Sequence, residues 1–251
     1  MDHPVMDAPA FSSPPGPFST PEEKRPFVQK LFTNIAPRYD WFNRLASCGL
    51  DQRWRAVTVA RGAVGPGQRV LDLCAGTGDL AILCARRQRG TGVVVGADMN
   101  GAMLAHARAK QRAKGLRIAW LQADAEALPF AGGSFDRIVI GFSTRNLSHL
   151  DQGLREMVRV LRPKGRLVIL ETGRPSNPIV RAAYQFFLFT AARTIGWLLT
   201  GQVWPFTYLA KSVQGFLAPQ QFVERLERAG TRAEYVPLSF GMASLYLATK
   251  P

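Results

Sequence analysis

Val70-Leu-Asp-Leu-Cys-Ala-Gly-Thr-Gly-Asp79 is the stretch that decides the fold of this chain of 251 residues. The apolar run Arg69–Leu73 predicts a short buried strand, and a helical pattern extends from Gly78 to about Arg87. Between them, Gly76 and Gly78 let the backbone approach a ligand closely, and the helix N-terminus offers unpaired N–H donors. On its own the pattern also fits a plain tight turn between a strand and a helix.

Predicted strands and helices alternate along the rest of the chain. Further strands are expected at Val93–Ala97, Ile118–Gln122, Phe135–Ile140 and Leu167–Leu170. Helices are expected at Leu50–Arg61, Ala102–Lys114, Leu150–Leu161 and Pro219–Ala229, and a turn at Arg162–Gly165. This alternation predicts a mostly parallel sheet that is covered on both faces.

The C-terminal part predicts how the sheet closes. Two strand-like runs, Tyr235–Phe240 and Ala243–Ala248, are separated only by Gly241 and Met242, which favours an antiparallel hairpin. The expected fold class is therefore α/β and Rossmann-like. It is a mostly parallel seven-stranded sheet with a closing antiparallel hairpin, plus N-terminal helices and a helical insertion.

The domain organisation follows from length and proline content. Residues 1–26 hold seven prolines among small polar residues and predict a disordered tail, because proline fixes φ and lacks a donor. Residues 27–251 are expected to form one domain. Within it, 27–64 predict a helical cap, and 175–215 predict a helical insertion on the substrate side.

Composition narrows the class of protein. Lys and Arg outnumber Asp and Glu by 32 to 18, which suits nucleic acid, an anionic membrane or an acidic substrate. No cluster of aromatic and basic residues typical of RNA readers appears, so we expect no nucleic-acid partner. Cys48, Cys74 and Cys84 lack metal-ligand or redox spacing, and no secretory signal is apparent. We therefore expect a cytoplasmic protein without a metal.

Two acidic residues indicate which ligand binds at the glycine loop. Asp98 ends the second predicted strand, where a carboxylate accepts both ribose hydroxyls of a nucleoside. Asp124-Ala125 follow the third strand, within reach of an adenine amine. Because open parallel sheets bind ligands at the carboxyl edge, these groups converge on one adenosine. A nicotinamide dinucleotide is the main alternative, but no separate catalytic domain is apparent. The pattern favours an S-adenosylmethionine-dependent methyltransferase.

From about Phe32 onward the chain resembles the UbiE/MenG family of ubiquinone and menaquinone biosynthesis C-methyltransferases. The stretches that carry the resemblance are Ile35-Ala-Pro-Arg-Tyr-Asp-Trp-Phe-Asn43, Trp54-Arg55, Leu71–Asp79, Ala123-Asp-Ala-Glu-Ala-Leu-Pro-Phe130, Phe135-Asp136, Arg145-Asn146 and Arg159-Val-Leu-Arg-Pro-Lys-Gly165. Two stretches depart from the family pattern, Gly141-Phe-Ser-Thr-Arg-Asn146 and Glu171-Thr-Gly-Arg-Pro175. Both fall on the substrate side, so they leave the identity of the ring open.

The resemblance implies a cofactor site and a substrate. The residues expected to bind S-adenosylmethionine are Asp72, Gly76, Thr77, Gly78, Asp98, Met99, Asp124, Ala125 and Gly141. Of these, Asp72 is expected chiefly to orient the glycine loop. The implied reaction methylates a ring carbon of a prenylated quinol. Demethylmenaquinol is favoured over the benzoquinol of the ubiquinone pathway, and another small aromatic or lipid acceptor stays open.

Carbon is a poor nucleophile until a neighbouring hydroxyl is ionised. We expect Arg145 to face the developing phenolate, with Asn146 and Tyr39 fixing the quinol. Arginine stays charged, so water or another group must take the proton. Two alternatives remain open for Arg145, which could cap a helix or pair with Asp151. Tyr39 could be an ordinary core residue.

The predicted insertion carries an apolar stripe at helical spacing, with Arg174, Arg181 and Arg193 beside it. Its residues are Tyr184, Phe187, Leu188, Ala191, Ile195 and Leu198. It is either a lid packed on the core or a face for the prenyl tail at the inner surface of an anionic membrane. The sequence leaves a homodimer open.

Overall fold

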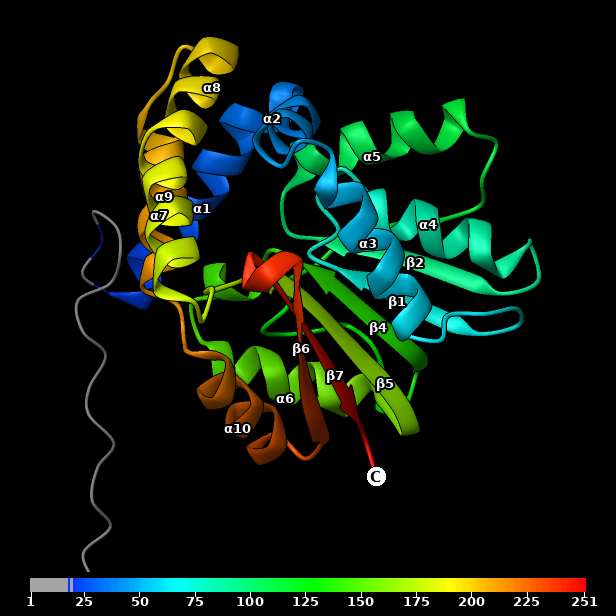
Figure 1. Ribbon diagram of the computed structural model, residues 1–251. Coiled ribbons are helices and arrows are strands. Elements are labelled where there is room, and N and C mark those ends of the chain that lie inside the picture. The colour runs from blue at the N-terminus through cyan, green and yellow to red at the C-terminus, as the bar shows by residue number, and fades with distance from the viewer. Residues whose placement is uncertain (1–17, 19) are drawn as a thin grey trace, which may run out of the picture.

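The computed structural model describes residue 18 and residues 20–251. Within these residues the centre is a seven-stranded sheet with the order β3-β2-β1-β4-β5-β7-β6 (Figure 1). The strands are β1 (Arg69–Leu73), β2 (Val93–Asp98), β3 (Ala119–Gln122), β4 (Phe135–Gly141), β5 (Leu161–Thr172), β6 (Arg232–Leu238) and β7 (Ala243–Thr249). Pairs β5–β7 and β6–β7 are antiparallel, and the others are parallel. The predicted fold class is confirmed.

Helices cover both faces of the sheet. They are α1 (Pro21–Ile35), α2 (Tyr39–Ala46), α3 (Leu50–Arg61), α4 (Asp79–Gln88), α5 (Gly101–Ala113), α6 (Leu150–Val160), α7 (Pro178–Phe189), α8 (Ala191–Thr200), α9 (Trp204–Gln214) and α10 (Pro219–Arg228), with short 3-10 turns η1 (Ala36–Arg38), η2 (Thr144–Asn146) and η3 (Ser239–Gly241). Apolar residues of α6 and α10 pack on one face and those of α3 and α4 on the other. The strands between them are buried on both sides, which is why they are almost continuously apolar.

Strand β5 differs from the expectation at its start. The turn predicted at residues 162–165 is an irregularity inside the strand, where the register against β4 shifts. Lys164 adopts a left-handed φ of 61° and donates its N–H to the carbonyl of Lys250 at 3.0 Å. The backbone of Lys250, just after β7, therefore pairs with Lys164 and Gly165 of the bulge, and the strand continues through the Pro163 that suggested a turn.

The closing hairpin is longer in its connection than expected. Strand β6 ends at Leu238, and η3 joins it to β7. Ser239 and Phe240 both have positive φ, which ends the extended backbone two residues before the predicted boundary.

Helix α1 corrects the boundary of the tail. It begins at Pro21, six residues before the predicted start of the helical cap. Thr20 caps it by accepting the N–H of Glu23, and proline is favourable at the first helical position because that N–H has no partner there. Residues 1–17 of the expected tail lie outside the described residues.

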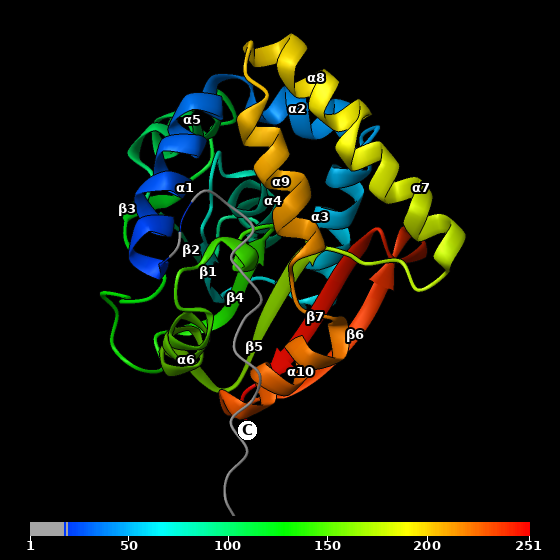
Figure 2. The ribbon, with the colours of Figure 1, turned by 90° about the vertical axis from the view of Figure 1, so that its left-hand side faces the viewer.

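Above the carboxyl ends of the parallel strands, α1, α2, α8 and α9 pack together around a third apolar cluster (Figure 2). Three helices, α7 to α9, fill the range expected to be a helical insertion. Among the described residues, no helix combines the length and apolar character that crossing a bilayer requires. We call helices α1, α2 and α7 to α9 the cap. The cap lies over the edge of the sheet where ligands bind in this architecture.

Candidate active site

The glycine loop after β1 has one closed and one open side. Gly76 and Gly78 have φ of 54° and 82°, a region that favours glycine. A Cβ at Gly78 would meet the Trp120 ring at 2.5 Å, whereas a Cβ at Gly76 would meet nothing within 4 Å. Trp120 therefore supports the loop from β3, and the side at Gly76 is free for a ligand.

Asp72 holds the start of α4. Its buried carboxylate accepts the Ala81 N–H at 2.7 Å, and burial raises the pKa of Asp72 to about 8. It does not line the cleft described below, in keeping with the orienting role expected from the sequence.

Asp98 lies at the end of β2 beside the loop. Its two oxygens accept the N–H groups of Gly76 at 2.7 Å and Asn100 at 2.8 Å. Burial raises the pKa of Asp98. A carboxylate has about four lone-pair sites, so each oxygen retains capacity for one more donor, which matches the two hydroxyls of a ribose.

Asp124 follows β3 and is engaged from an unexpected direction. One oxygen accepts the Glu126 N–H at 2.9 Å, and the other pairs with Arg25 of α1 at 2.8 Å. Arg25 also contacts the Glu126 carboxylate at 3.1 Å. The carboxylate expected to meet an adenine amine is therefore already held by an arginine that sequence reasoning had placed in the tail.

A cleft connects these groups. Its lining residues are Arg25, Val28, Gln29, Phe32, Tyr39, Cys74, Gly76, Asp98, Met99, Asn100, Met103, Ala123, Asp124, Ala125, Glu126, Ser143, Asn146, Leu147 and Ser148. Of the predicted cofactor residues, five line it: Gly76, Asp98, Met99, Asp124 and Ala125. The contribution of α1 was missed. The spacing Thr20-Pro-Glu-Glu23, a capping signature with proline at the first position, is the signal that would have revealed it.

Thr77 faces away from this cleft. Its hydroxyl donates to Asp40 of α2 at 2.6 Å, and Lys110 of α5 contacts Thr77, Asp40 and Asp79 at 3.1, 2.8 and 2.6 Å. Although burial opposes ionisation of Asp79, Lys110 and Arg55 lower its pKa. These contacts fasten the cap to the glycine loop.

Gly141 ends β4 near the cleft without lining it. A Cβ there would meet Leu80 at 2.9 Å, so close packing against α4 is one reason for glycine at this position. For Asp72, Thr77, Gly78 and Gly141, contact with the cofactor stays a prediction.

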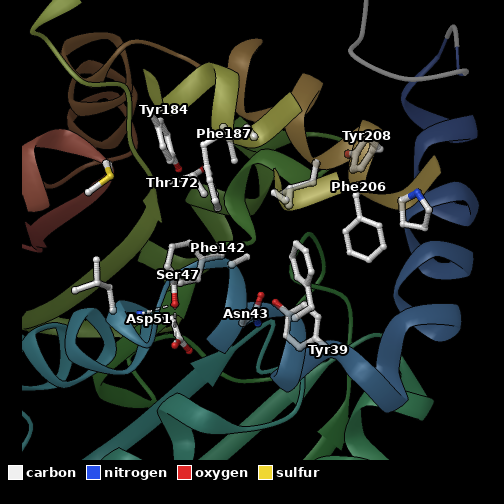
Figure 3. A pocket seen from close by; sticks show the side chains of 18 of the residues that line it. Tyr39, Asn43, Ser47, Asp51, Phe142, Thr172, Tyr184, Phe187, Phe206 and Tyr208 are labelled. Atoms are coloured by element: carbon white, nitrogen blue, oxygen red, sulfur yellow. Dashed lines mark hydrogen bonds between the residues drawn. The ribbon is translucent and has the colours of Figure 1, made fainter. Parts of the chain in front are cut away.

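A second, apolar cavity of about 450 Å³ lies under the cap (Figure 3). Its aromatic lining is Phe32, Tyr39, Phe42, Trp54, Phe142, Tyr184, Phe187, Phe206 and Tyr208. Tyr39, Phe32 and Asn146 line both this cavity and the cleft, so the two spaces meet at these side chains. The predicted catalytic residues Tyr39 and Asn146 are thus brought to the junction, and Arg145 lines the apolar cavity.

Asn146 carries a free donor at this junction. Its Oδ1 accepts the Tyr208 hydroxyl at 3.1 Å, whereas its Nδ2 is buried and has no hydrogen-bond partner in the described part of the chain. A buried donor without a hydrogen bond costs about 1–3 kcal/mol, so the Nδ2 of Asn146 is available to an acceptor atom of a ligand.

Arg145 pairs with Glu171 rather than with Asp151. The guanidinium Nη1 contacts Glu171 Oε1 and the Phe142 carbonyl, each at 2.5 Å, and Nε donates to Ser212 at 3.3 Å. Asp151 pairs with Arg225. Glu171 is fully buried, so this ion pair fixes the arginine in one position on the cavity wall.

Asp51 was not singled out from the sequence. Among the described residues it is the carboxylate that lines the apolar cavity, and its side chain is almost fully buried. Ser47, Gln52 and Arg55 donate to it at 3.1, 2.9 and 3.2 Å. The pair Ser47 and Asp51 carries no recognised motif, and only the packing of α3 under the cap reveals it (Figure 3).

The fold and the cleft define a Rossmann-like S-adenosylmethionine-dependent methyltransferase. Solved structures share the fold at low sequence identity. A SAM-dependent methyltransferase from Aquifex aeolicus matches with a TM-score of 0.60 at 18% identity, covering 78% of this chain and 89% of that one. The [4+2]-cyclase SpnF matches with a TM-score of 0.62 at 18% identity, covering 89% and 95%.

The chain belongs to the ubiE/COQ5 methyltransferase family, whose model matches residues 19–250. A demethylmenaquinone methyltransferase of Thermus thermophilus is 41% identical over 88% of this chain and 100% of its own. The ubiquinone/menaquinone biosynthesis C-methyltransferase UbiE of Hahella chejuensis is 39% identical over 91% and 93%. The cofactor is S-adenosylmethionine, and the resemblance seen in the sequence is confirmed.

Asp98→Asn should weaken binding of S-adenosylmethionine and its demethylated product about ten- to a hundredfold. The reason is that charge-assisted bonds to the ribose are worth about 1.5–3 kcal/mol, and each 1.4 kcal/mol is a factor of ten. Calorimetric titration measures the affinity. Asp136→Asn is the matched control, since Asp136 binds Arg162 and the Arg69 N–H away from the cleft. Equal affinity of the Asp98 variant and the parent chain would contradict the site.

Asp72→Asn should change how stability depends on pH. The pKa of Asp72 is raised from 3.8 to about 8, so between these values the folded chain holds a proton that the unfolded chain releases. This contribution to stability is therefore present below about pH 4 and declines as pH rises towards 8. Denaturant titrations at pH 5 and 8 should show the variant gaining on the parent chain by a few kcal/mol at the higher pH. A constant difference would show that Asp72 is ionised in the folded state.

Proposed function

We propose that this methyltransferase methylates a ring carbon of a prenylated quinol, with demethylmenaquinol as the favoured acceptor. The observation that carries the proposal is the junction of the two spaces: an aromatic cavity of about 450 Å³ meets the cofactor cleft at Tyr39 and Asn146. A flat ring with an apolar tail suits such a cavity, since ligand pockets are mostly apolar with a few placed polar groups. The names of the relatives support this class of acceptor.

S-adenosylmethionine, when bound, supplies an electrophilic methyl group, and Asp98, Met99, Asp124 and Ala125 are the residues that would hold it. The task of the chain is to orient and activate the ring. Good orientation alone is worth roughly 7–11 kcal/mol of the barrier. Asn146 Nδ2, unpartnered at the junction, is the donor we assign to a quinol oxygen.

Arg145 stabilises the phenolate that develops on the ring. Glu171 and the Phe142 carbonyl hold its Nη1, and within the described residues its Nη2 forms no hydrogen bond. A fixed positive group in an apolar wall acts without reorganising during the reaction, which is the condition for effective electrostatic stabilisation.

Asp51 accepts the proton of the quinol hydroxyl in this proposal. Burial raises the pKa values of Tyr184 and Tyr208 to about 12, so both keep their protons, and arginine does not accept one. The O–H bond breaks towards Asp51, and its electron pair raises the charge density at the adjacent ring carbon. After methylation that carbon loses its own proton to water, and Asp51 returns its proton to the ring oxygen.

The benzoquinol of the ubiquinone pathway is the second candidate acceptor, favoured by relatives named for both quinones. Demethylmenaquinol, a demethylated benzoquinol and a simple phenol should be assayed side by side with S-adenosylmethionine under reducing conditions. We expect the naphthoquinol to have the highest kcat/KM and the phenol to be methylated at least about a hundredfold less efficiently, because it lacks the tail. Equal turnover of the phenol, or none of either quinol, would overturn the proposal.

Asp51→Asn should lower kcat with quinol about 10²- to 10⁴-fold, the usual contribution of a general base, and leave the KM for S-adenosylmethionine unchanged. Its remaining activity should rise with pH, because solvent then ionises the quinol. Asp51→Glu keeps the carboxylate and should restore part of the rate. An increased cofactor KM with normal kcat would instead assign Asp51 to the methionine end of the cofactor.

A further inference from the structure

Helices α2, α7 and α8 of the cap and the neighbouring turn η3 expose large apolar side chains. They are Trp41, Leu45, Ile179, Phe186, Trp197, Leu198 and Phe240, each at least 50% exposed. Ile179 and Phe186 are seven residues apart and share one face of α7, whereas Trp197 and Leu198 are neighbours on α8. Helix α2 packs against α8, and η3 packs on Pro175 just before α7. We call these seven residues the apolar face; Figure 2 shows α7 and α8 running along one side of the molecule.

The charged side chains of the segment that carries most of this face are all positive. Residues 172–223 contain no Asp or Glu, but they include Arg174, Arg181, Arg193 and Lys211. Arg174 and Lys211 are exposed, and the Nε of Arg193 is buried without a partner among the described residues. In a chain with 18 acidic residues, a stretch of 52 residues without one leaves the exposed Arg174 and Lys211 available to an anionic partner.

The same two helices also form a wall of the apolar cavity. Val180, Tyr184, Phe187 and Leu188 of α7, with Ala192 of α8, line it from the inside. Helices α7 and α8 are therefore apolar both towards the cavity and towards the outside. A helix with this character is normally surrounded by protein or by lipid.

We propose that the apolar face docks on an anionic lipid membrane and sets the cavity beside the bilayer. The inference deepens the proposed function, because a prenylated acceptor resides in that bilayer. A second copy of the chain fits the face less well. A twofold contact brings the same patch of both copies together, and this one would bring together two copies of segment 172–223, which holds four cations and no carboxylate. Aromatic and basic side chains together are what interfacial helices present to lipid.

Vesicle sedimentation of the full chain tests the proposal. The probes are vesicles of phosphatidylcholine alone and of phosphatidylcholine mixed with phosphatidylglycerol. At low salt we expect at least about tenfold stronger binding to the anionic vesicles, falling as salt is added. The double variant Phe186→Ser and Trp197→Ser should bind at least about tenfold more weakly. Val93→Ser, an exposed apolar residue at the amino end of β2, is the matched control and should bind like the parent chain.

Two binding results would overturn the docking surface: vesicle binding that is independent of lipid charge at low salt, and an equal loss of binding in the Val93 control. A third is a dimer of the parent chain, seen by light scattering, that the double variant no longer forms. The last would assign the face to a second copy. Vesicle binding requires no quinol, so it is independent of the reaction. Turnover of a short-chain, water-soluble quinol should be the same in the parent chain and the double variant. Absence of that turnover with intact vesicle binding would reject the proposed function alone.

Discussion

A lysine held between two carboxylates connects the cap with the glycine loop and with helix α4. Lys110 of α5 contacts Asp40 of the cap and Asp79 at the start of α4, and Thr77 of the glycine loop completes the cluster. Apolar packing, which has little directional preference, joins the same parts, and Asn100 at the N-cap of α5 also donates to Gln29 and Thr33 of α1. The charged cluster fixes the angle at which the cap meets the sheet, and hence the place where the apolar cavity opens onto the cleft.

Two further ion pairs lie in the wall of that cavity, Arg145 with Glu171 and Arg55 with Asp51. Buried pairs of this kind add little net stability, since desolvation offsets the attraction, but removing one partner costs about 3–5 kcal/mol. Their effect here is geometric. An arginine and a carboxylate each keep one position in an otherwise apolar space, so the polar groups that meet a ring are fixed before it arrives.

Much of this arrangement could be predicted from the sequence, because its signals are local. The strand, loop and helix of residues 69–88 follow from periodicity and glycine spacing, and Asp98 follows from its place at a strand end. Prediction from the sequence was wrong or incomplete where a tertiary contact decides the structure. Proline content suggested a tail up to residue 26, yet Pro21 opens a helix that places Arg25 over Asp124. The partner of Arg145 is Glu171, 26 residues away and on the next strand of the sheet, and no spacing rule connects the two. Asp51 enters the cavity only because the cap folds over it.

Arg25 gives the cleft an internal competitor. It occupies Asp124 and Glu126, so a nucleoside that uses these carboxylates must share them with the arginine or displace it. Binding of the ligand and displacement of α1 are consequently coupled. By reciprocity, anything that draws α1 away from the sheet changes cofactor affinity by the same factor as the cofactor changes the position of α1.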